Sequence, residues 1–191
     1  MSGQAVGHEG MSGAGRMAQE TIDLKDFIRK VPDFPKAGIL FIDITPLLAD
    51  ARALAAAIDA LSDPFVDAGV DVVAAVEARG FIFGAAVARR LGAGFVPLRK
   101  KGKLPWRTES VSYALEYGTD TIEAHTDALG PGRRVLMIDD LLATGGTMAA
   151  ACRLMEKLGA EIVGLTFLIE LSGLAGRDRL EGYPLHVVIR Y

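Results

Sequence analysis

The sequence predicts an α/β domain in which a central parallel sheet is flanked by helices on both faces. Between residues 70 and 169, short apolar runs alternate with longer segments that have the periodicity of helices. The short runs are apolar at nearly every position, which is typical of parallel strands buried on both faces. The 191 residues, of which 50% are hydrophobic and 24% charged, are enough for one domain with a substantial core.

The chain before the sheet is predicted to change from disorder to order. Residues 1–18 are rich in glycine and small polar residues, so they cannot bury enough apolar surface to offset the entropy of ordering. We therefore expect a disordered N-terminal extension, followed by a single domain over residues 19–191. The apolar spacing within Ile22–Val31 suits a short amphipathic helix that ends at Pro32.

The remaining elements follow in order. A short apolar run at Gly38–Ile44 and an Ala-rich helix over residues 50–61 precede the sheet. The alternation then predicts strands over residues 70–76, 95–98, 134–138 and 161–169, and helices over residues 81–91 and 147–158. Residues 99–126 interrupt it, because they are basic at first and then alternate with a period of two. This segment is predicted to be a flexible loop that leads into an antiparallel hairpin.

Composition and charge exclude several classes of protein. The net charge of −3 and the pI near 5.6 argue against a protein that coats nucleic acid, so we expect no nucleic-acid partner. The apolar runs are far shorter than the roughly 20 residues of a membrane helix, and no signal peptide is legible, so we expect a cytoplasmic protein without a membrane contact. A single cysteine, Cys152, and three widely spaced histidines argue against a Cys- or His-based metal centre, and no metal ligand is predicted.

Chemistry-bearing residues concentrate where the strand Val135–Ile138 ends. Ligands of open α/β sheets bind at the carboxyl ends of strands, and there Asp139 and Asp140 offer two acceptor-only groups that suit the two hydroxyls of a ribose diol. The turn Ala143–Thr147 supplies small residues and two hydroxyls at the start of a helix, where backbone amides can surround a phosphate. The alternative is an ordinary turn in which Thr144 or Thr147 caps the helix, but that alternative leaves the carboxylate pair unexplained.

Five segments, in this order and spacing, resemble a known family: Pro32–Pro35, Gly38–Pro46, Glu77–Phe81, Arg99–Pro105 with Leu115–Gly118, and Asp139–Thr147. Over residues 21–190 the chain resembles the adenine phosphoribosyltransferases, of the type I phosphoribosyltransferase family. The resemblance implies a central parallel sheet with a small N-terminal hood and a flexible catalytic loop. It implies transfer of the 5-phosphoribosyl group from phosphoribosyl pyrophosphate (PRPP) to N9 of adenine, which gives AMP and pyrophosphate. It also implies a homodimer and a Mg²⁺ ion carried mainly by PRPP or pyrophosphate.

The resemblance assigns roles to individual residues. It implies that PRPP is bound by Asp139, Asp140, Ala143, Thr144, Gly145, Gly146 and Thr147, together with Arg79, Arg99, Lys100 and Lys103. Arg79, in a loop where the family often holds a non-proline cis peptide, is expected to meet the pyrophosphate. Lys103 and the purine-facing carboxylate Glu116 are the other expected catalytic residues, with Glu116 moving a proton at N7. The competing interpretation is that these charged side chains are solvated surface groups, which we favour only for Lys101.

The purine is implied to lie between two apolar side chains. The two residues that enclose the purine in the family correspond to Leu40 and Leu171. Backbone groups around Leu40 and Ile42 are expected to form hydrogen bonds with the edge of adenine. The family usually has arginine at position 42, so any role of that side chain is lost here. Without the resemblance, ordinary core packing is the better explanation of Leu40 and Leu171. Trp106 is either a lid contact or a dimer contact.

Two other functions compete with this one. A phosphoribosyltransferase for xanthine, hypoxanthine or another base would share the Asp139–Thr147 motif, although Leu115–Gly118 and the Leu40 region favour adenine. A regulator that binds PRPP or nucleotides without catalysis would share the fold. Such regulators generally carry a basic face for DNA, which the acidic pI argues against.

Overall fold

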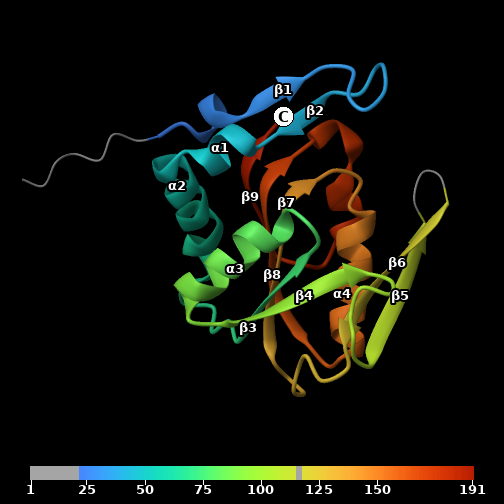
Figure 1. Cartoon of the computed structure of the whole chain (residues 1–191). Helices are drawn as coiled ribbons and strands as arrows, with labels where there is room; N and C mark the ends of the chain where they lie inside the picture. The colour runs from blue at the N-terminus through green and yellow to red at the C-terminus, as the bar shows by residue number, and fades with distance from the viewer. Residues whose placement is uncertain (1–21, 115–117) are drawn as a thin grey trace, which may run out of the picture.

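A computed structural model describes residues 22–114 and 118–191, and their fold is an α/β sandwich around a twisted sheet (Figure 1). The sheet has seven strands in the order β5-β6-β4-β3-β7-β8-β9. Their bounds are β3 Val72–Val76, β4 Gly94–Lys100, β5 Thr108–Ala114, β6 Thr119–His125, β7 Arg134–Leu142, β8 Glu161–Glu170 and β9 Leu185–Arg190. The strands β4, β3, β7, β8 and β9 are parallel, which confirms the predicted sheet. The strand β9 was not among the predicted ones.

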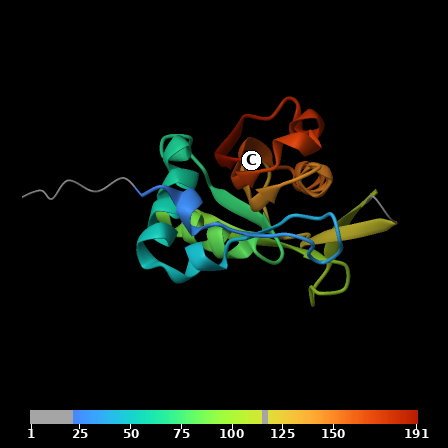
Figure 2. The same cartoon turned by 90° about the horizontal axis from the view of Figure 1, so that it is seen from above.

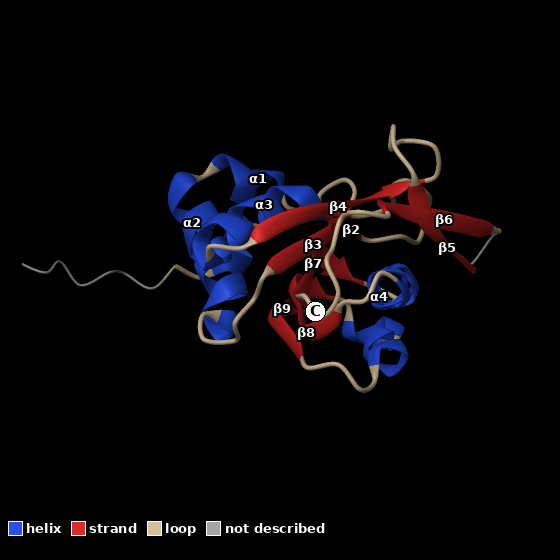
Figure 3. Cartoon of the chain, turned by 90° about the horizontal axis from the view of Figure 1, so that it is seen from below, coloured by secondary structure: helices blue, strands red, loops and turns tan. Residues whose placement is uncertain are grey.

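The two faces of the sheet carry separate cores. Successive side chains of a strand point to opposite faces, and in β3 the residues Val73 and Ala75 pack with the helices α2 Ala51–Ser62 and α3 Gly80–Leu91. The alternate β3 residues pack with the helix α4 Gly146–Lys157. Figure 3 shows these helices on either side of the strands. The helices predicted over residues 50–61, 81–91 and 147–158 are thus confirmed, with helices on both faces.

The N-terminal helix predicted over Ile22–Val31 is wrong. Asp23 accepts a hydrogen bond from the amide of Lys25 and starts only a single 3-10 turn, η1 Leu24–Phe27. The chain then extends into the strand β1 Arg29–Val31, which pairs antiparallel with β2 Phe41–Asp43. Pairing with β2 therefore makes residues Arg29–Val31 extended, and the spacing of apolar residues within this segment cannot indicate such a partner. We call β1 and β2 the hood, and it lies above the carboxyl ends of the central strands (Figure 1).

Shorter elements connect the larger ones. The helix α1 Thr45–Ala49 has Pro46 in its first turn, so Pro46 begins a helix after the predicted apolar run. Single 3-10 turns occur at η2 Asp63–Phe65, η3 Ser172–Leu174 and η4 Gly176–Leu180. Across residues 22–114 and 118–191, every helix is too short or too polar to cross a membrane.

The segment between β4 and β7 forms the predicted hairpin. Strands β5 and β6 pair antiparallel over their whole length, and β6 also pairs antiparallel with the end of β4. Seen from above, the hairpin extends away from the domain on the side opposite to α2 (Figure 2). The hairpin packs on α4, where Tyr113 and Ile122 join the core. Residues 115–117, between β5 and β6 in the sequence, lie outside the described residues.

Candidate active site

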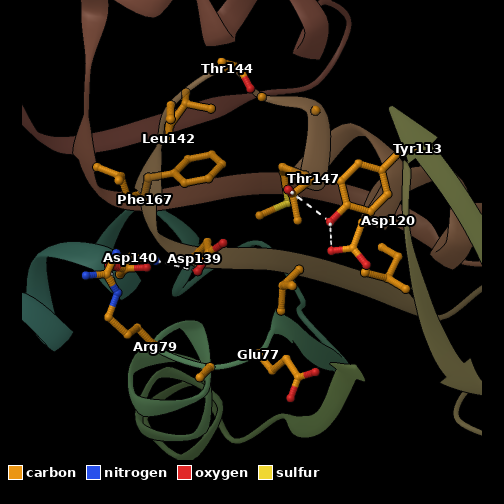
Figure 4. A pocket seen from close by; sticks show the side chains of 18 of the residues that line it. Glu77, Arg79, Tyr113, Asp120, Asp139, Asp140, Leu142, Thr144, Thr147 and Phe167 are labelled. Atoms are coloured by element: carbon orange, nitrogen blue, oxygen red, sulfur yellow. Dashed lines mark hydrogen bonds and ion pairs between the residues drawn. The ribbon is translucent and has the colours of Figure 1, made fainter. Parts of the chain in front are cut away.

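A cavity of about 510 Å³ opens where β3 and β7 end and where α3 and α4 begin. Its wall contains the ends of these strands, the turn before α4 and three residues of the hairpin, Tyr113, Asp120 and Ile122. Arg79 and Asp140 lie on one side of it, and Tyr113, Asp120 and Thr147 lie on the opposite side (Figure 4). Of the residues predicted to bind PRPP, the cavity collects Arg79, Lys100, Asp139, Asp140, Ala143, Thr144, Gly145, Gly146 and Thr147.

The carboxylate pair lies within β7, because this strand continues to Leu142 and not only to Ile138 as predicted. Pairing with β8 extends that far, with Asp139 opposite Phe167 and Leu142 opposite Glu170. The side chain of Asp140 is only 7% exposed, and its Oδ2 lies 2.9 Å from the Nε of Arg79. Burial raises the pKa of Asp140, and the Arg79 guanidinium opposes that rise.

Among the described residues Asp139 forms no ion pair, and the Arg79 charge acts on it only from a distance. The surrounding protein and the neighbouring charge of Asp140 raise the pKa of the Asp139 carboxyl well above its ordinary value of 3.8. Its Oδ1 accepts the amide of Asp140 at 2.9 Å. A Cβ on Gly80 would lie 2.7 Å from the same oxygen, so glycine at the start of α3 makes room for this carboxylate. Two acceptor groups, of which Asp140 forms the ion pair with Arg79, are therefore held at the cavity wall.

We expect Asp139→Asn to raise the thermal stability of the ligand-free protein at neutral pH. A carboxyl whose pKa is raised by folding contributes stability that is fully present below its ordinary pKa and is lost as the pH rises through the raised value. The amide cannot ionise, and its oxygen can still accept the Asp140 amide. The melting temperature should rise by a few degrees at pH 8, since about 1 kcal/mol moves it by roughly 2–4 °C in a domain of this size.

Melting curves at pH 8 and at pH 4.5 check this expectation. The gain in melting temperature should shrink at the lower pH, because less of the wild-type carboxyl is ionised there. A variant that is less stable than the wild type at both pH values would contradict the ionisation argument.

The turn Ala143–Thr147 is shaped by two glycines in different loops. Gly145 has a φ of 75° and caps α4 without any side-chain hydrogen bond, so the alternative in which Thr144 or Thr147 caps this helix is wrong. A Cβ on Gly145 would lie 2.3 Å from the carbonyl oxygen of Gly176. A Cβ on Gly176 would in turn lie 2.2 Å from the carbonyl oxygen of Ala143. The turn therefore packs backbone against backbone on residues 171–180, with its amides at the positive end of α4.

The arginine loop Glu77–Gly80 contains the cis peptide bond expected from the resemblance, between Glu77 and Ala78. The side chain of Glu77 is 9% exposed and receives hydrogen bonds from the Arg99 guanidinium and the Lys103 ammonium. Burial alone would raise the pKa of Glu77, but the Lys100 amide and the Arg99 side chain hold that pKa below its usual value. Glu77 thus gathers two of the predicted PRPP ligands, which do not themselves line the cavity.

The three residues predicted for adenine lie elsewhere. Leu40, just before β2 of the hood, is 51% exposed, Ile42 is buried in the core, and Leu171 is partly buried beside that core. None of them is in the cavity wall. Between Leu40 and Ile42, the ring of Phe41 lies 5.4 Å below the Arg79 guanidinium, so the hood does touch the arginine of the cavity.

Sequence reasoning left some of the cavity's residues without a role. Glu116, the predicted proton carrier, lies outside the described residues. Tyr113, which the sequence indicated as a packing residue, is indeed 8% exposed in the core, yet its hydroxyl also reaches the cavity. Asp120 and Phe167 were not considered. The pairing of Glu77 with Arg99 and Lys103 could have been predicted from the sequence. An acidic residue directly follows the apolar strand β3, and the distant segment Arg99–Lys103 is basic.

The chain matches a family model described as a phosphoribosyl transferase domain over residues 42–188. It is 55% identical to an adenine phosphoribosyltransferase of Rhodopirellula baltica over 176 residues, which are 92% of this chain and 85% of the relative. The crystal structure of adenine phosphoribosyltransferase from Rhodothermus marinus superposes with a TM-score of 0.85 at 56% identity, over 88% of this chain and 96% of that one.

A further solved structure includes ligands. Adenine phosphoribosyltransferase from Saccharomyces cerevisiae, complexed with adenine and an imino-altritol bisphosphate, superposes with a TM-score of 0.82 at 39% identity, over 86% of this chain and 96% of that one. The match to the family model, the identity to these enzymes and the shared fold lead to one assignment: the chain belongs to the adenine phosphoribosyltransferases, within the phosphoribosyltransferase family.

Proposed function

We propose that the protein transfers the 5-phosphoribosyl group from PRPP to N9 of adenine, giving AMP and pyrophosphate. One observation carries this proposal: a carboxylate pair, an arginine and the turn Ala143–Thr147, which we call the phosphate turn, face a single cavity of about 510 Å³. That set matches the parts of PRPP, which has a ribose diol, a diphosphate and a 5-phosphate. The names of the relatives supply the choice of adenine as the acceptor.

In this proposal the turn Ala143–Thr147 binds the 5-phosphate through its amides and hydroxyls. Asp139 and Asp140 accept hydrogen bonds from the ribose hydroxyls. Arg79 turns from Asp140 to the diphosphate, where its charge stabilises the pyrophosphate as it leaves. Lys103, Arg99 and Lys100 add positive charge on the same side. Leu40 and Leu171 enclose the base, and the backbone at Ile42 reads its edge.

Magnesium is part of the proposal, carried by the substrate. Among residues 22–114 and 118–191, no group of three or more His, Cys, Asp or Glu side chains could hold a metal ion. Asp139 and Asp140 nevertheless offer oxygens at the cavity, which fits a Mg²⁺ ion that keeps most of its water and binds mainly to substrate phosphates. When bound, this ion neutralises charge on the diphosphate. We also propose a homodimer, which rests on the resemblance alone, and a location in the cytoplasm, as the sequence patterns predict.

The test is AMP formation from PRPP and Mg²⁺ by the purified protein, with adenine, hypoxanthine, guanine and xanthine offered in parallel. Turnover with adenine alone, lost on addition of EDTA, is the expected result. Turnover with a different base would overturn the adenine assignment but keep the PRPP site. PRPP binding without turnover on any base would instead favour a regulator.

Glu116→Ala is expected to lower kcat by about 100-fold or more, because a positioned proton carrier contributes roughly 10²–10⁴-fold. The dissociation constant for PRPP should stay within about twofold, since the proposed contact is with the purine and not with PRPP. Steady-state kinetics combined with calorimetric titration of PRPP separate the two effects. Normal turnover in this variant would remove Glu116 from the reaction.

A further inference from the structure

Tyr113 of β5 carries a hydroxyl between two partners on the cavity wall. The residue is 8% exposed, and its ring packs in the core between the hairpin and α4. Its oxygen accepts a hydrogen bond from Thr147 Oγ1 at 3.4 Å and donates to Asp120 Oδ2 at 3.4 Å (Figure 4). Because the packed ring fixes the position of this oxygen, only its hydrogen can change direction.

The contacts of Tyr113 belong to a longer chain of polar groups. Asp120 Oδ2 also lies 3.2 Å from the Lys100 ammonium. The chain Thr147, Tyr113, Asp120 and Lys100 therefore joins the phosphate turn to the basic end of β4, both of which line the cavity. It connects the two regions where PRPP would place its separate phosphate groups.

The number of hydroxyl hydrogens in this series of polar groups limits how many hydrogen bonds the groups can donate at one time. A threonine hydroxyl and a tyrosine hydroxyl each have one hydrogen to donate. Here the hydrogen of Thr147 is used on Tyr113, and the hydrogen of Tyr113 is used on Asp120. A phosphate dianion in the turn accepts hydrogen bonds only, so Thr147 must turn its hydrogen away from Tyr113 to reach that ligand.

We propose that Tyr113 is a positioning residue that directs the Thr147 hydroxyl toward the 5-phosphate of PRPP. When Thr147 donates to the phosphate, the hydrogen of Tyr113 turns from Asp120 to Thr147 Oγ1, and Asp120 keeps Lys100 as its partner. No atom is transferred, since only two O–H bonds rotate. This inference rests on the proposed function, because it takes the 5-phosphate to lie in the turn Ala143–Thr147.

Two properties of the site suit such a change of partner. Both contacts of the hydroxyl are long for O–H···O hydrogen bonds, so each is weak and little is lost when one is replaced. Burial raises the pKa of Tyr113, so its hydroxyl stays neutral and keeps its hydrogen at physiological pH. Thr147 becomes a better donor when its oxygen accepts a hydrogen bond at the same time.

A double-mutant cycle on PRPP binding tests the inference. We expect Tyr113→Phe to weaken PRPP binding by about fivefold, the typical effect of one uncharged hydrogen bond, with kcat and the KM for adenine nearly unchanged. Thr147→Val should weaken binding more. The double variant should bind no worse than Thr147→Val alone, because Tyr113 acts only through Thr147. Calorimetric titration of PRPP and initial-rate kinetics supply the measurements.

Tyr183→Phe is the matched control, since its hydroxyl bonds to Glu156 away from the cavity. It should leave PRPP binding as in the wild type. Equal binding by wild type and Tyr113→Phe, or additive losses in the double variant, would overturn the inference while leaving the proposed function intact. A wild-type protein that neither binds PRPP nor forms AMP would overturn both.

Discussion

Replacing Gly145 by alanine is expected to lower kcat/KM for PRPP by about 100-fold or more, because a shift of about 1 Å in a binding group can cost that much. The added Cβ would lie 2.3 Å from the carbonyl oxygen of Gly176, so one of the two backbones must move. The φ of 75° at Gly145 adds strain for any residue with a Cβ. The amides of the turn would then no longer surround the phosphate.

The matched control for this change is Gly173→Ala. Gly173 lies in the adjoining loop, has no atom within 4 Å of an added Cβ and does not have a positive φ. It should keep nearly full activity. Initial-rate kinetics, with melting curves to show that both variants are folded, make the comparison. A Gly145→Ala protein as active as Gly173→Ala would mean that the turn does not hold the phosphate.

The second large effect is expected for Arg79→Gln, which should lower kcat by about 10²–10³-fold, as is typical when one stabilising group is removed from a transition state. The substitution removes the cation proposed to meet the leaving pyrophosphate. It also leaves Asp140 without the partner that now lies 2.9 Å away. Arg79→Lys should recover only part of the activity, because an ammonium cannot reproduce the planar fork of the guanidinium.

Arg89→Gln is the control, because Arg79 directly precedes α3 whereas Arg89 lies in the last turn of that helix and is exposed. Its kcat should be that of the wild type. Measuring both the forward reaction and AMP pyrophosphorolysis is informative, since a group that stabilises pyrophosphate must affect both directions. Full activity of Arg79→Gln in either direction would remove Arg79 from the proposed mechanism.

The central parallel strands could be predicted because each of β3, β7 and β8 contains a run of apolar residues. In β3 every residue is buried, and no polar residue obscures its limits. The hood strand β1 lacks such a pattern, since Arg29 and Lys30 are exposed and only pairing with β2 defines it. The strand β9 was overlooked for a similar reason: only one of its six residues is fully buried.

The candidate site was predictable where its residues are adjacent in the sequence. Asp139–Thr147 forms one contiguous wall of the cavity. The segment directly follows the apolar run Val135–Ile138, and this position at a strand end predicted ligand binding. The partners of these residues come from distant segments. The contact of Glu77 with Arg99 spans 22 positions, and that of Thr147 with Tyr113 spans 34. Such pairs depend on the strand order and on the orientation of the hairpin, which local patterns do not specify.

The contact between Gly145 and Gly176 also limits how this protein can be engineered. The amide of Leu171 donates to the carbonyl of Leu142 at 2.9 Å, and five residues later Gly176 abuts Ala143. Residues 171–180 and the phosphate turn are thus in contact at two places. A library that remodels residues 171–180 to accept another base will displace the phosphate turn as well. Variants with a new base preference should therefore arise only when both loops are randomised together.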